Sequence, residues 1–554
     1  MKKLFTLIIL FFVSSIGYSQ KLDVKAALNN LFRYGNGQET NTNLSTYPKE
    51  YFENIGDARL KVNDFVLGMR YEISDPIEFG VNFKGLRKRY IEYNDVTNGI
   101  SVRAGDSWDI VSRGLSLNLF EDRGLFYDTG VDGVRVSYKK TFGDKKPVKI
   151  KAQILGGDIN FTDYLKNSAR TETYKIRDGN FEVSPLKNLI MGVNYVYAKG
   201  EVMSANLKNF TSLTAEVPEG YMSLNYKAIK FFYSYAHKHI LTDLSPDYPT
   251  KISSYGNGMY SSLSFSKPGF GLTLDYKNYR FDLVSPDQRD RTRPTKMMPF
   301  QNPPTALKEH TSTLISRNPH VVDFNDEVGT QLDIIYAPSE KVTFNLNASV
   351  TSRHYEYYNS DTTGYLYKWT RIDRYNNFLP SLRNNLSPFW EVYFEGEYYA
   401  TDKLYTKAAF SRQNETVYSF ENPIASEKIF NTTIPVELRY SLTKDYTFKF
   451  IFEQQWAHNT SHSLTTDYTN QFIALSLSKS PNLTITANTE FTTDQDDPSG
   501  KQNWFSGEIS YKVTSTNVLT AMYGRERGGL KCTNGICRYV YPFDGFRLSL
   551  SSKF

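Results

Sequence analysis

Apolar and polar side chains alternate with a period of two through much of the second half of the chain. In one segment Val436 and Leu438 share a face, while Glu437 and Arg439 share the opposite face. The same alternation is found in the segments 342–351, 446–455 and 483–491. This period is typical of a β-strand that presents one apolar and one polar surface. We therefore expect antiparallel pairs of strands, each roughly ten residues long.

The turns that separate these segments alternate between short and long. Short turns are expected at 338–341, 400–403, 442–445, 479–482 and 514–517. Long polar loops are expected at 352–388, 413–431, 457–467, 492–503 and 525–544. Outer-membrane barrels have short periplasmic turns and long extracellular loops, so this alternation favours a barrel over a soluble sandwich. The sequence predicts an all-β fold, a large transmembrane antiparallel β-barrel of roughly 20 to 24 strands.

Both ends of the chain are typical of an exported barrel. Residues 1–19 are predicted to be a Sec signal peptide, because Lys2 and Lys3 precede an apolar segment that is too short to span a bilayer. We expect residues 20–60 to form a periplasmic segment or a first strand pair and residues 61–554 to form the barrel. The residues before the first clear strand are too few for a plug domain or periplasmic assembly domains, which argues against a TonB-dependent receptor and against an insertase.

The last strand alternates up to a terminal Phe554. A terminal Phe on an amphipathic strand resembles the signal that the barrel-assembly machinery recognises in its substrates. Together with the export signal, it predicts integration into the cell outer membrane. We therefore expect contacts with outer-membrane lipid and lipopolysaccharide, and with the assembly machinery through the last strand.

Composition narrows the class of partner. The 554-residue chain is 15% aromatic and 40% hydrophobic, and we find no apolar run in the mature sequence that is long enough for a spanning helix. Removal of Lys2 and Lys3 with the signal peptide leaves 63 basic residues of the original 65 against 59 acidic residues. Nucleic-acid-binding proteins usually carry a strong basic stripe, so this near balance argues against nucleic acid as a partner.

Charged side chains on the polar strand faces are expected to line the lumen. The candidates are Glu391, Glu395, Glu397, Glu437, Arg439, Lys449, Glu453 and Arg547. Paired carboxylates can also act in acid and base catalysis, but any water-filled barrel carries charge on its inner face. We therefore favour a pore lining, assign no catalytic residue and expect no cofactor.

Two segments are candidates for filling or capping a wide barrel. Residues 282–326 form the longest expected loop, which folds into the barrel as a constriction, caps the outer mouth or docks another protein. Residues 108–130 are expected to pair their charges inside the lumen, because a barrel of more than about 20 strands leaves a wide hole unless something fills it. The candidate residues for constriction or docking are Arg289, Arg291, Arg293, Arg113, Asp122 and Arg123.

Cys532 and Cys537 flank an Asn-Gly pair in the last long loop. Asn-Gly is a tight-turn signal and an exported protein lies in a compartment that permits disulfides, so we expect a cross-linked hairpin tip. A reactive redox pair is the alternative. A metal site is disfavoured, because we expect no histidine ligand nearby.

The histidines offer a further possible chemistry. His237 and His239 share one face of an expected strand, and His458 and His462 lie in an expected loop. A metal at the first pair would need a third ligand, so we favour a place for that pair at the outer rim of the barrel. For the second pair we favour solvated loop residues.

Three segments carry motifs of a known family: 104–138, which includes Glu121-Asp122-Arg123, 303–329, which includes Lys308-Glu309-His310-Thr311, and 527–538, which includes both cysteines. On these motifs the chain resembles an uncharacterised family of Bacteroidota outer-membrane proteins, a domain of unknown function. The resemblance implies an outer-membrane barrel over nearly the whole chain. It implies no catalytic or binding residue, because the family has no settled activity.

Three functions remain open from the sequence. We favour a porin-like channel or transporter whose lumen is restricted by the 282–326 loop. The alternative is a non-catalytic accessory subunit of an outer-membrane secretion, assembly or uptake complex, with an outer-membrane protein as its partner. A barrel enzyme acting on lipids or peptides is the third and least favoured hypothesis. We therefore expect the protein not to be an enzyme.

Overall fold

The computed structural model describes residues 23–554 except 42–43, 145–146, 164–169, 204–209, 246–247, 284–297, 360–368 and 421. The predicted signal peptide, residues 1–19, lies outside the described residues. So do three of the predicted loop residues, Arg289, Arg291 and Arg293.

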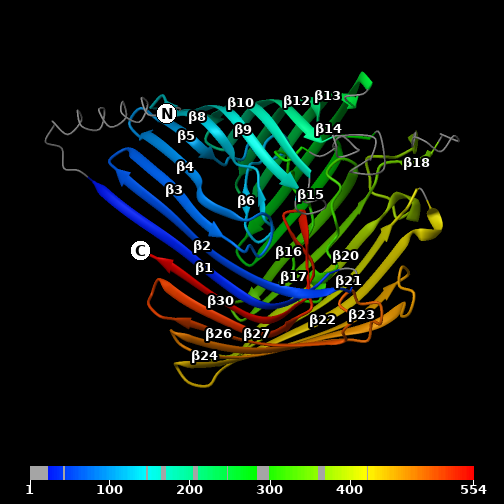
Figure 1. Ribbon diagram of the computed structural model, residues 1–554. Helices are drawn as coiled ribbons and strands as arrows, with labels where there is room; N and C mark the ends of the chain where they lie inside the picture. Colours follow the sequence, from blue (N-terminus) through cyan, green and yellow to red (C-terminus); the bar gives the residue numbers. More distant parts are fainter. Residues whose placement is uncertain are drawn as a thin grey trace.

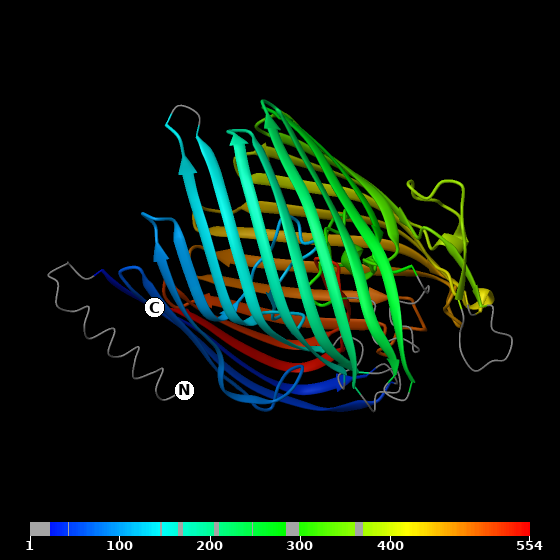
Figure 2. The same ribbon diagram turned by 90° about the horizontal axis from the view of Figure 1, so that it is seen from above.

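Twenty-four antiparallel strands form one closed barrel (Figures 1 and 2). The wall strands are β1 (Val24–Thr40), β2 (Thr46–Val62), β3 (Phe65–Ser74), β4 (Phe83–Asp95), β5 (Ile100–Ser107), β8 (Val131–Phe142), β9 (Val148–Asp163), β10 (Arg170–Leu186), β11 (Leu189–Met203), β12 (Phe210–Tyr226), β13 (Ile229–Ser245), β14 (Tyr248–Lys267), β15 (Phe270–Arg280), β16 (Glu327–Ser339), β17 (Val342–Ser352), β20 (Phe389–Thr401), β21 (Leu404–Val417), β22 (Glu427–Ser441), β23 (Tyr446–Asn459), β24 (Asp467–Lys479), β25 (Leu483–Thr492), β26 (Asn503–Lys512), β27 (Asn517–Glu526) and β30 (Phe543–Lys553). Each wall strand pairs with the next along the chain, and β30 pairs with β1, which closes the barrel. The predicted all-β barrel is confirmed.

The remaining elements are short and lie between wall strands. They are the hairpins β6 (Glu121–Asp122) with β7 (Tyr127–Asp128), β18 (Glu356–Asn359) with β19 (Trp369–Ile372) and β28 (Gly529–Thr533) with β29 (Ile536–Val540), and the 3-10 turns η1 (Ile315–Arg317), η2 (Asn384–Leu386) and η3 (Pro423–Ala425). Within the described residues, no helix is long and apolar enough to cross a membrane.

The alternation of turn lengths follows the prediction. The turns between β16 and β17, between β20 and β21 and between β24 and β25 are short, whereas the next connection in each case is long. One predicted loop, 413–431, is shorter than expected, because β21 continues to Val417 and β22 begins at Glu427. Short turns are typical of the periplasmic end and long loops of the extracellular end.

The outward face of the wall is apolar. On β11, Val193 and Tyr195 are exposed, whereas Asn194 and Val196, which alternate with them, are buried. Phe394 on β20 and Leu477 on β24 are exposed in the same way. A continuous apolar outer surface on a closed barrel is what a lipid bilayer requires, because closure leaves no strand edge unpaired.

Three segments from the long-loop end fold back into the lumen (Figures 1 and 2). We name them insert A (residues 108–130, between β5 and β8), insert B (residues 298–326, between β15 and β16) and hairpin C (residues 529–540, β28 and β29). Insert B contains η1, and insert A contains β6 and β7.

Inserts A and B pack against an apolar part of the inner wall. Leu115 and Leu117 of insert A and Phe300 of insert B are fully buried in one cluster with the inner faces of β9 to β15. Wall members of the cluster include Leu155, Ile176, Val196, Ala215, Ile240 and Tyr279. Fully burying a large apolar side chain contributes about 1.5 to 3 kcal/mol, so this cluster holds both inserts firmly. This half of the inner wall therefore differs from the polar lining expected of a water-filled lumen.

Candidate functional site

The predicted carboxylates of β20 lie on the inner face of the wall. Glu391 is buried, accepts a hydrogen bond of 2.9 Å from Ser411 Oγ, and lies 2.9 Å from Nε2 of His310 in insert B. Glu395 accepts a hydrogen bond of 2.6 Å from Tyr393 Oη. Glu397 follows on the same face. Glu391 therefore contacts insert B, whereas Glu395 and Glu397 lie nearer the short-turn end of the barrel.

Glu437, Arg439 and Lys449 form a small ion-pair group near the short-turn end of β22 and β23. Arg439 pairs with Glu437, and Lys449 Nζ lies 3.7 Å from the same carboxylate. Glu437 is buried, whereas Arg439 and Lys449 are partly exposed, so solvent weakens both pairs and the lumen near the short turns stays polar.

Glu453 of β23 anchors insert B to the wall. Its carboxylate accepts hydrogen bonds from Ser312 Oγ at 2.7 Å, from the Thr313 backbone N–H at 2.9 Å and from the Leu314 backbone N–H at 2.7 Å. Gln455 on the same strand donates to the Leu314 carbonyl at 3.0 Å. The predicted lumen residue Glu453 is therefore a docking point for the loop rather than a solvated pore residue.

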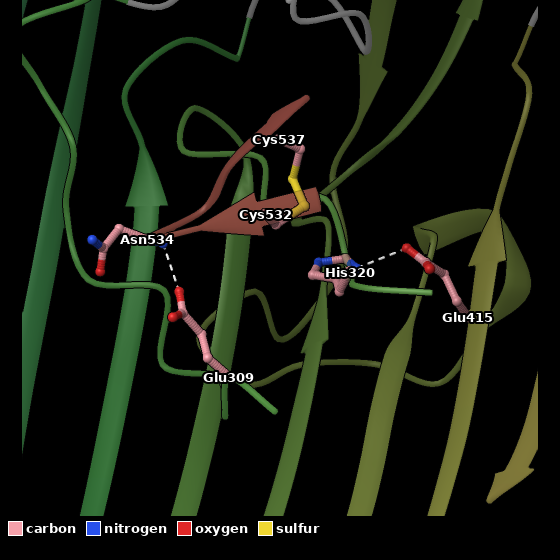
Figure 3. Close-up of a disulfide and its surroundings, with 6 residues drawn as sticks. All are labelled: Glu309, His320, Glu415, Cys532, Asn534 and Cys537. Atoms are coloured by element: carbon pink, nitrogen blue, oxygen red, sulfur yellow. Dashed lines mark hydrogen bonds and ion pairs between the residues drawn. A yellow bond between two sulfur atoms is a disulfide. The ribbon is translucent and has the colours of Figure 1, made fainter. Parts of the chain in front are cut away.

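His320 of insert B lies between two wall carboxylates. Its Nδ1 is 2.8 Å from Glu415 of β21, and its Nε2 is 3.3 Å from Glu327 at the start of β16 (Figure 3 shows the Glu415 contact). Burial disfavours the charged ring, but the two carboxylates outweigh burial and raise the pKa of His320 to about 9. The imidazolium is therefore the form that holds this end of insert B at neutral pH.

Insert A is held by two ion pairs in its β6–β7 hairpin and by Ser116, which precedes this hairpin. Arg70 of β3 binds Glu121 at 2.6 Å, and Lys88 of β4 binds Asp128 at 2.6 Å. The Ser116 hydroxyl and backbone N–H both donate to the buried Glu219 of β12. Because β12 also faces the apolar cluster, insert A crosses the lumen and closes this side of the barrel.

The three predicted residues of insert A have different roles. Arg113 stacks on Phe232, with its guanidinium carbon 5.0 Å from the ring centroid. Asp122 accepts a local hydrogen bond from the Leu125 N–H, and Arg123 lies 3.6 Å from Glu72 of β3. Of these three residues, Arg123 forms an ion pair with the wall, Arg113 stacks on a wall ring and Asp122 makes a local contact.

Hairpin C docks on insert B (Figure 3). Cys532 and Cys537 form a disulfide across the hairpin, and the Asn534 backbone N–H donates to Glu309 of insert B at 2.6 Å. The turn residues Asn534 and Gly535 both have positive φ, as a two-residue hairpin turn requires. A Cβ on Gly535 would lie 2.6 Å from the Phe324 ring, so glycine is also needed for the close approach.

An ion-pair bridge links insert B, the wall and the base of hairpin C. Glu490 of β25 binds Arg317 of insert B and, at 2.8 Å, Arg527 just after β27. Arg317 also donates to the Gly528 carbonyl, and Arg527 binds Asp497 at 2.9 Å. We name Arg317, Glu490 and Arg527 together the Glu490 bridge.

Two cavities meet at the Glu490 bridge. The outer cavity, about 600 Å³, is lined by residues at the long-loop ends of the wall, such as Ser387, Asn459 and Pro498. The inner cavity, about 580 Å³, is lined by residues further along the strands, such as Asn488 and Arg547. The lining residues that the two cavities share are Arg317, Arg527, Gly528, Gly529 and Leu530.

The alternation in 483–491 already places Glu490 on the polar face, but its two arginine partners lie far away in the chain. Arg317 is separated from Glu490 by 173 residues. From the sequence, only the inward position of Glu490 could be predicted, and not its pairing with the two arginines.

The histidines singled out in the sequence lie outside the two lumenal inserts. His239 stacks on Tyr255 on the outward side, with ring centroids 4.4 Å apart, and His458 pairs with Asp467 at 2.8 Å. Among the described residues, His462 lies with Asp494 and Asp496 in a group that could hold a metal ion. The Asp496 carboxylate already caps the backbone N–H groups of residues 463 to 465, so the group is accounted for as a loop cap.

The closed barrel, its apolar outer face and its lumenal inserts define an integral outer-membrane β-barrel protein. The chain belongs to the Family of unknown function (DUF6029), which matches residues 1–554. No curated protein matches the sequence.

Several solved structures are similar to this chain at low sequence identity. The copper transporter OprC has 11% identity and a TM-score of 0.43 over 96% of this chain and 80% of that chain. The siderophore receptor PirA from Pseudomonas aeruginosa has 7% identity and a TM-score of 0.43 over 97% and 81%. The FrpB iron transporter from Neisseria meningitidis has 10% identity and a TM-score of 0.40 over 97% and 83%.

Proposed function

We propose that this protein is a solute channel or transporter of the outer membrane whose passage is restricted by insert B and hairpin C. The observation that carries the proposal is the pair of cavities that meet at the Glu490 bridge. One cavity lies toward the outer mouth and the other lies deeper in the barrel, and polar side chains from three separate segments divide them.

The two halves of the lumen are closed by different kinds of contact. On the β9 to β15 side, the inserts are packed into an apolar cluster, which opens only if buried apolar surface is exposed to water. On the β20 to β30 side, the contact between the cavities consists of ion pairs and hydrogen bonds, which water and ionic solutes can replace. A passage on the second side can therefore open without unfolding the first.

The test is the conductance of the purified full-length protein in a planar bilayer, with and without residues 284–324. Removal of this segment deletes Arg317 and the contacts with Glu453, so we expect the conductance to increase. A matched control removes residues 422–425, which are exposed on the loop between β21 and β22 and line neither cavity, and should leave the conductance unchanged. Absence of conductance in both the full-length and the shortened protein would contradict the proposal.

A second function has one specific observation in its favour. Tyr375, Phe378, Leu379 and Leu382 are exposed on the outer loop between β19 and β20. Exposed apolar groups of this kind often mark a docking surface for a protein partner. An accessory subunit of an outer-membrane complex would then co-purify with a stoichiometric partner in mild detergent and show no conductance.

The remaining expectations belong to the same proposal. Export would use residues 1–19, and assembly would use the last strand with Phe554, in the outer membrane of a Bacteroidota cell. The outward face would contact lipid and lipopolysaccharide. We propose no enzymatic activity, no cofactor and no nucleic-acid partner.

A further inference from the structure

The inner cavity has a surplus of positive charge. Its lining contains eight basic side chains and four acidic ones. The basic residues are Arg33, Arg123, Arg317, Arg525, Arg527, Lys531, Arg538 and Arg547, and the acidic residues are Glu53, Glu78, Glu490 and Glu526. Three carboxylates outside this lining, Glu72, Asp497 and Asp544, pair with Arg123, Arg527 and Arg525, which reduces the positive excess to one charge.

Two of the eight cations lack a carboxylate partner. Within the part of the chain that the structure describes, Arg538 and Lys531, both in hairpin C, form no ion pair. Arg538 stacks on Phe79, with its guanidinium carbon 4.3 Å from the ring centroid. Burial and the neighbouring Arg33 and Arg547 lower the pKa of Arg538, and Glu78 opposes them. The charge of Arg538 is therefore poorly compensated by the protein.

The buried polar atoms of the cavity wall that lack a hydrogen-bond partner are nearly all donors. Among the described residues they are Nε of Arg33, Arg317, Arg538 and Arg547, Nε1 of Trp504 and a single acceptor, Glu53 Oε2, which is ion-paired with Arg33. Trp504 is only 3% exposed. Buried donors normally have acceptors, so a set of donors without acceptors calls for an occupant rich in acceptor oxygens.

Water alone would satisfy the donors but would leave Arg538 and Lys531 without a negatively charged partner. An oxyanion satisfies the donors and also compensates the positive charge, because carboxylate and phosphate oxygens accept the charge-assisted hydrogen bonds that guanidinium groups donate. The wall also presents apolar rings from Phe79, Phe126, Phe472 and Trp504. A cavity of about 580 Å³ is large enough for an organic molecule rather than a single inorganic ion.

We propose that the inner cavity binds an organic anion that carries two or more carboxylate or phosphate groups on an apolar or ring-shaped body. Arg538 and Lys531 are its principal ligands, and Trp504 donates a further hydrogen bond. This assignment rests on the proposed function in one respect, namely that the inner cavity belongs to the solute passage.

The test is calorimetric titration of the full-length protein in detergent with trimesate, a benzene ring with three carboxylates. The uncharged ring analogue benzene-1,3,5-trimethanol is the comparison ligand. We expect trimesate to bind with one-to-one stoichiometry, and about a hundredfold more tightly than the uncharged analogue. Equal binding of the two ligands, or no binding of trimesate, would overturn the proposal.

Variants locate the site within the protein. The double variant R538Q and K531Q should weaken trimesate binding about tenfold or more, because both unpaired charges are lost. The matched double variant R383Q and K403Q removes two exposed charges from loops outside the cavity, and should bind as the native protein does. Heat-dependent migration on a gel shows that each variant is folded, and a folded R538Q and K531Q variant with native affinity would refute the site.

The trimesate titration and the conductance experiment distinguish failure of the anion site from failure of the proposed passage. A protein that binds trimesate but conducts no current retains the anion site and loses the proposed passage. A protein that conducts but binds trimesate no better than its uncharged analogue retains the passage and loses the anion site.

Discussion

The anchoring of insert B by Glu453 gives the most quantitative prediction. The variant E453Q keeps the size of the side chain and removes its charge. In the native protein the carboxylate accepts three hydrogen bonds from residues 312 to 314, of which two reach the same oxygen, Oε2. A glutamine amide offers one acceptor oxygen, and its NH₂ group faces at least one of the backbone N–H donors.

The expected loss can be worked from these contacts. A hydrogen bond to a charged group contributes about 1.5 to 3 kcal/mol, and a weakened neutral contact replaces part of it. We expect E453Q to weaken the docking of η1 by about 3 kcal/mol. This corresponds to a shift of about 10²-fold in the equilibrium between docked and undocked states.

Hydrogen exchange at the Thr313 and Leu314 amides measures this shift directly. Their protection should fall by about 10²-fold in E453Q, and single-channel records should show more frequent openings. The control E397Q makes the same chemical change on the inner face of β20 and should leave these amides protected. Unchanged protection in E453Q, with the fold intact, would refute the view that Glu453 holds the insert.

Because the pKa of His320 is raised to about 9 from the ordinary 6.5, its stabilisation of insert B is complete below pH 6.5 and is lost as the pH rises through 9. The open fraction in bilayer recordings should therefore increase between pH 7 and pH 10, and the rise should be absent in H320Q. The variant G535A forces a Cβ against Phe324 at φ +77°, so hairpin C should undock at a cost of about 1 to 3 kcal/mol, seen as faster proteolysis within residues 529–540. The variant F554A should lower the amount of barrel assembled in the outer membrane without changing export, and an unchanged yield on fractionation would contradict the assembly role.

The barrel wall could be predicted from the sequence because its signals are local. Strand alternation depends on neighbouring residues, and a turn such as that between Thr401 and Leu404 is a short polar interruption of that pattern. The Asn534-Gly535 turn was equally readable, since both positions require positive φ. These features need no knowledge of distant segments.

The segments 108–130 and 282–326 could be named as candidates for filling the barrel, but their packing partners could not be predicted from local pattern. Leu115, Leu117 and Leu119 alternate with polar residues as a strand would, but they form no wall strand and pack against wall strands far along the chain. One signal did exist in the wall. In 195–198 the residues Tyr-Val-Tyr-Ala are apolar on both faces, which indicates that the inner face is covered. What covers it depends on tertiary contacts that spacing does not encode.

We infer that a polar route connects the outer mouth with the inner cavity past the Glu490 bridge. The direct measurement uses N488C, which places a thiol in the inner cavity, where Asn488 forms part of the wall. Both native cysteines are joined in the disulfide, so the new thiol is the only reactive one.

A small membrane-impermeant thiol reagent is added outside intact cells, and the rate of labelling is compared with and without E490Q. We expect slow labelling of N488C from outside and markedly faster labelling when the Glu490 bridge is weakened. Absence of labelling from outside in both backgrounds, while the same thiol reacts from the periplasmic side, would contradict a passage through this part of the barrel.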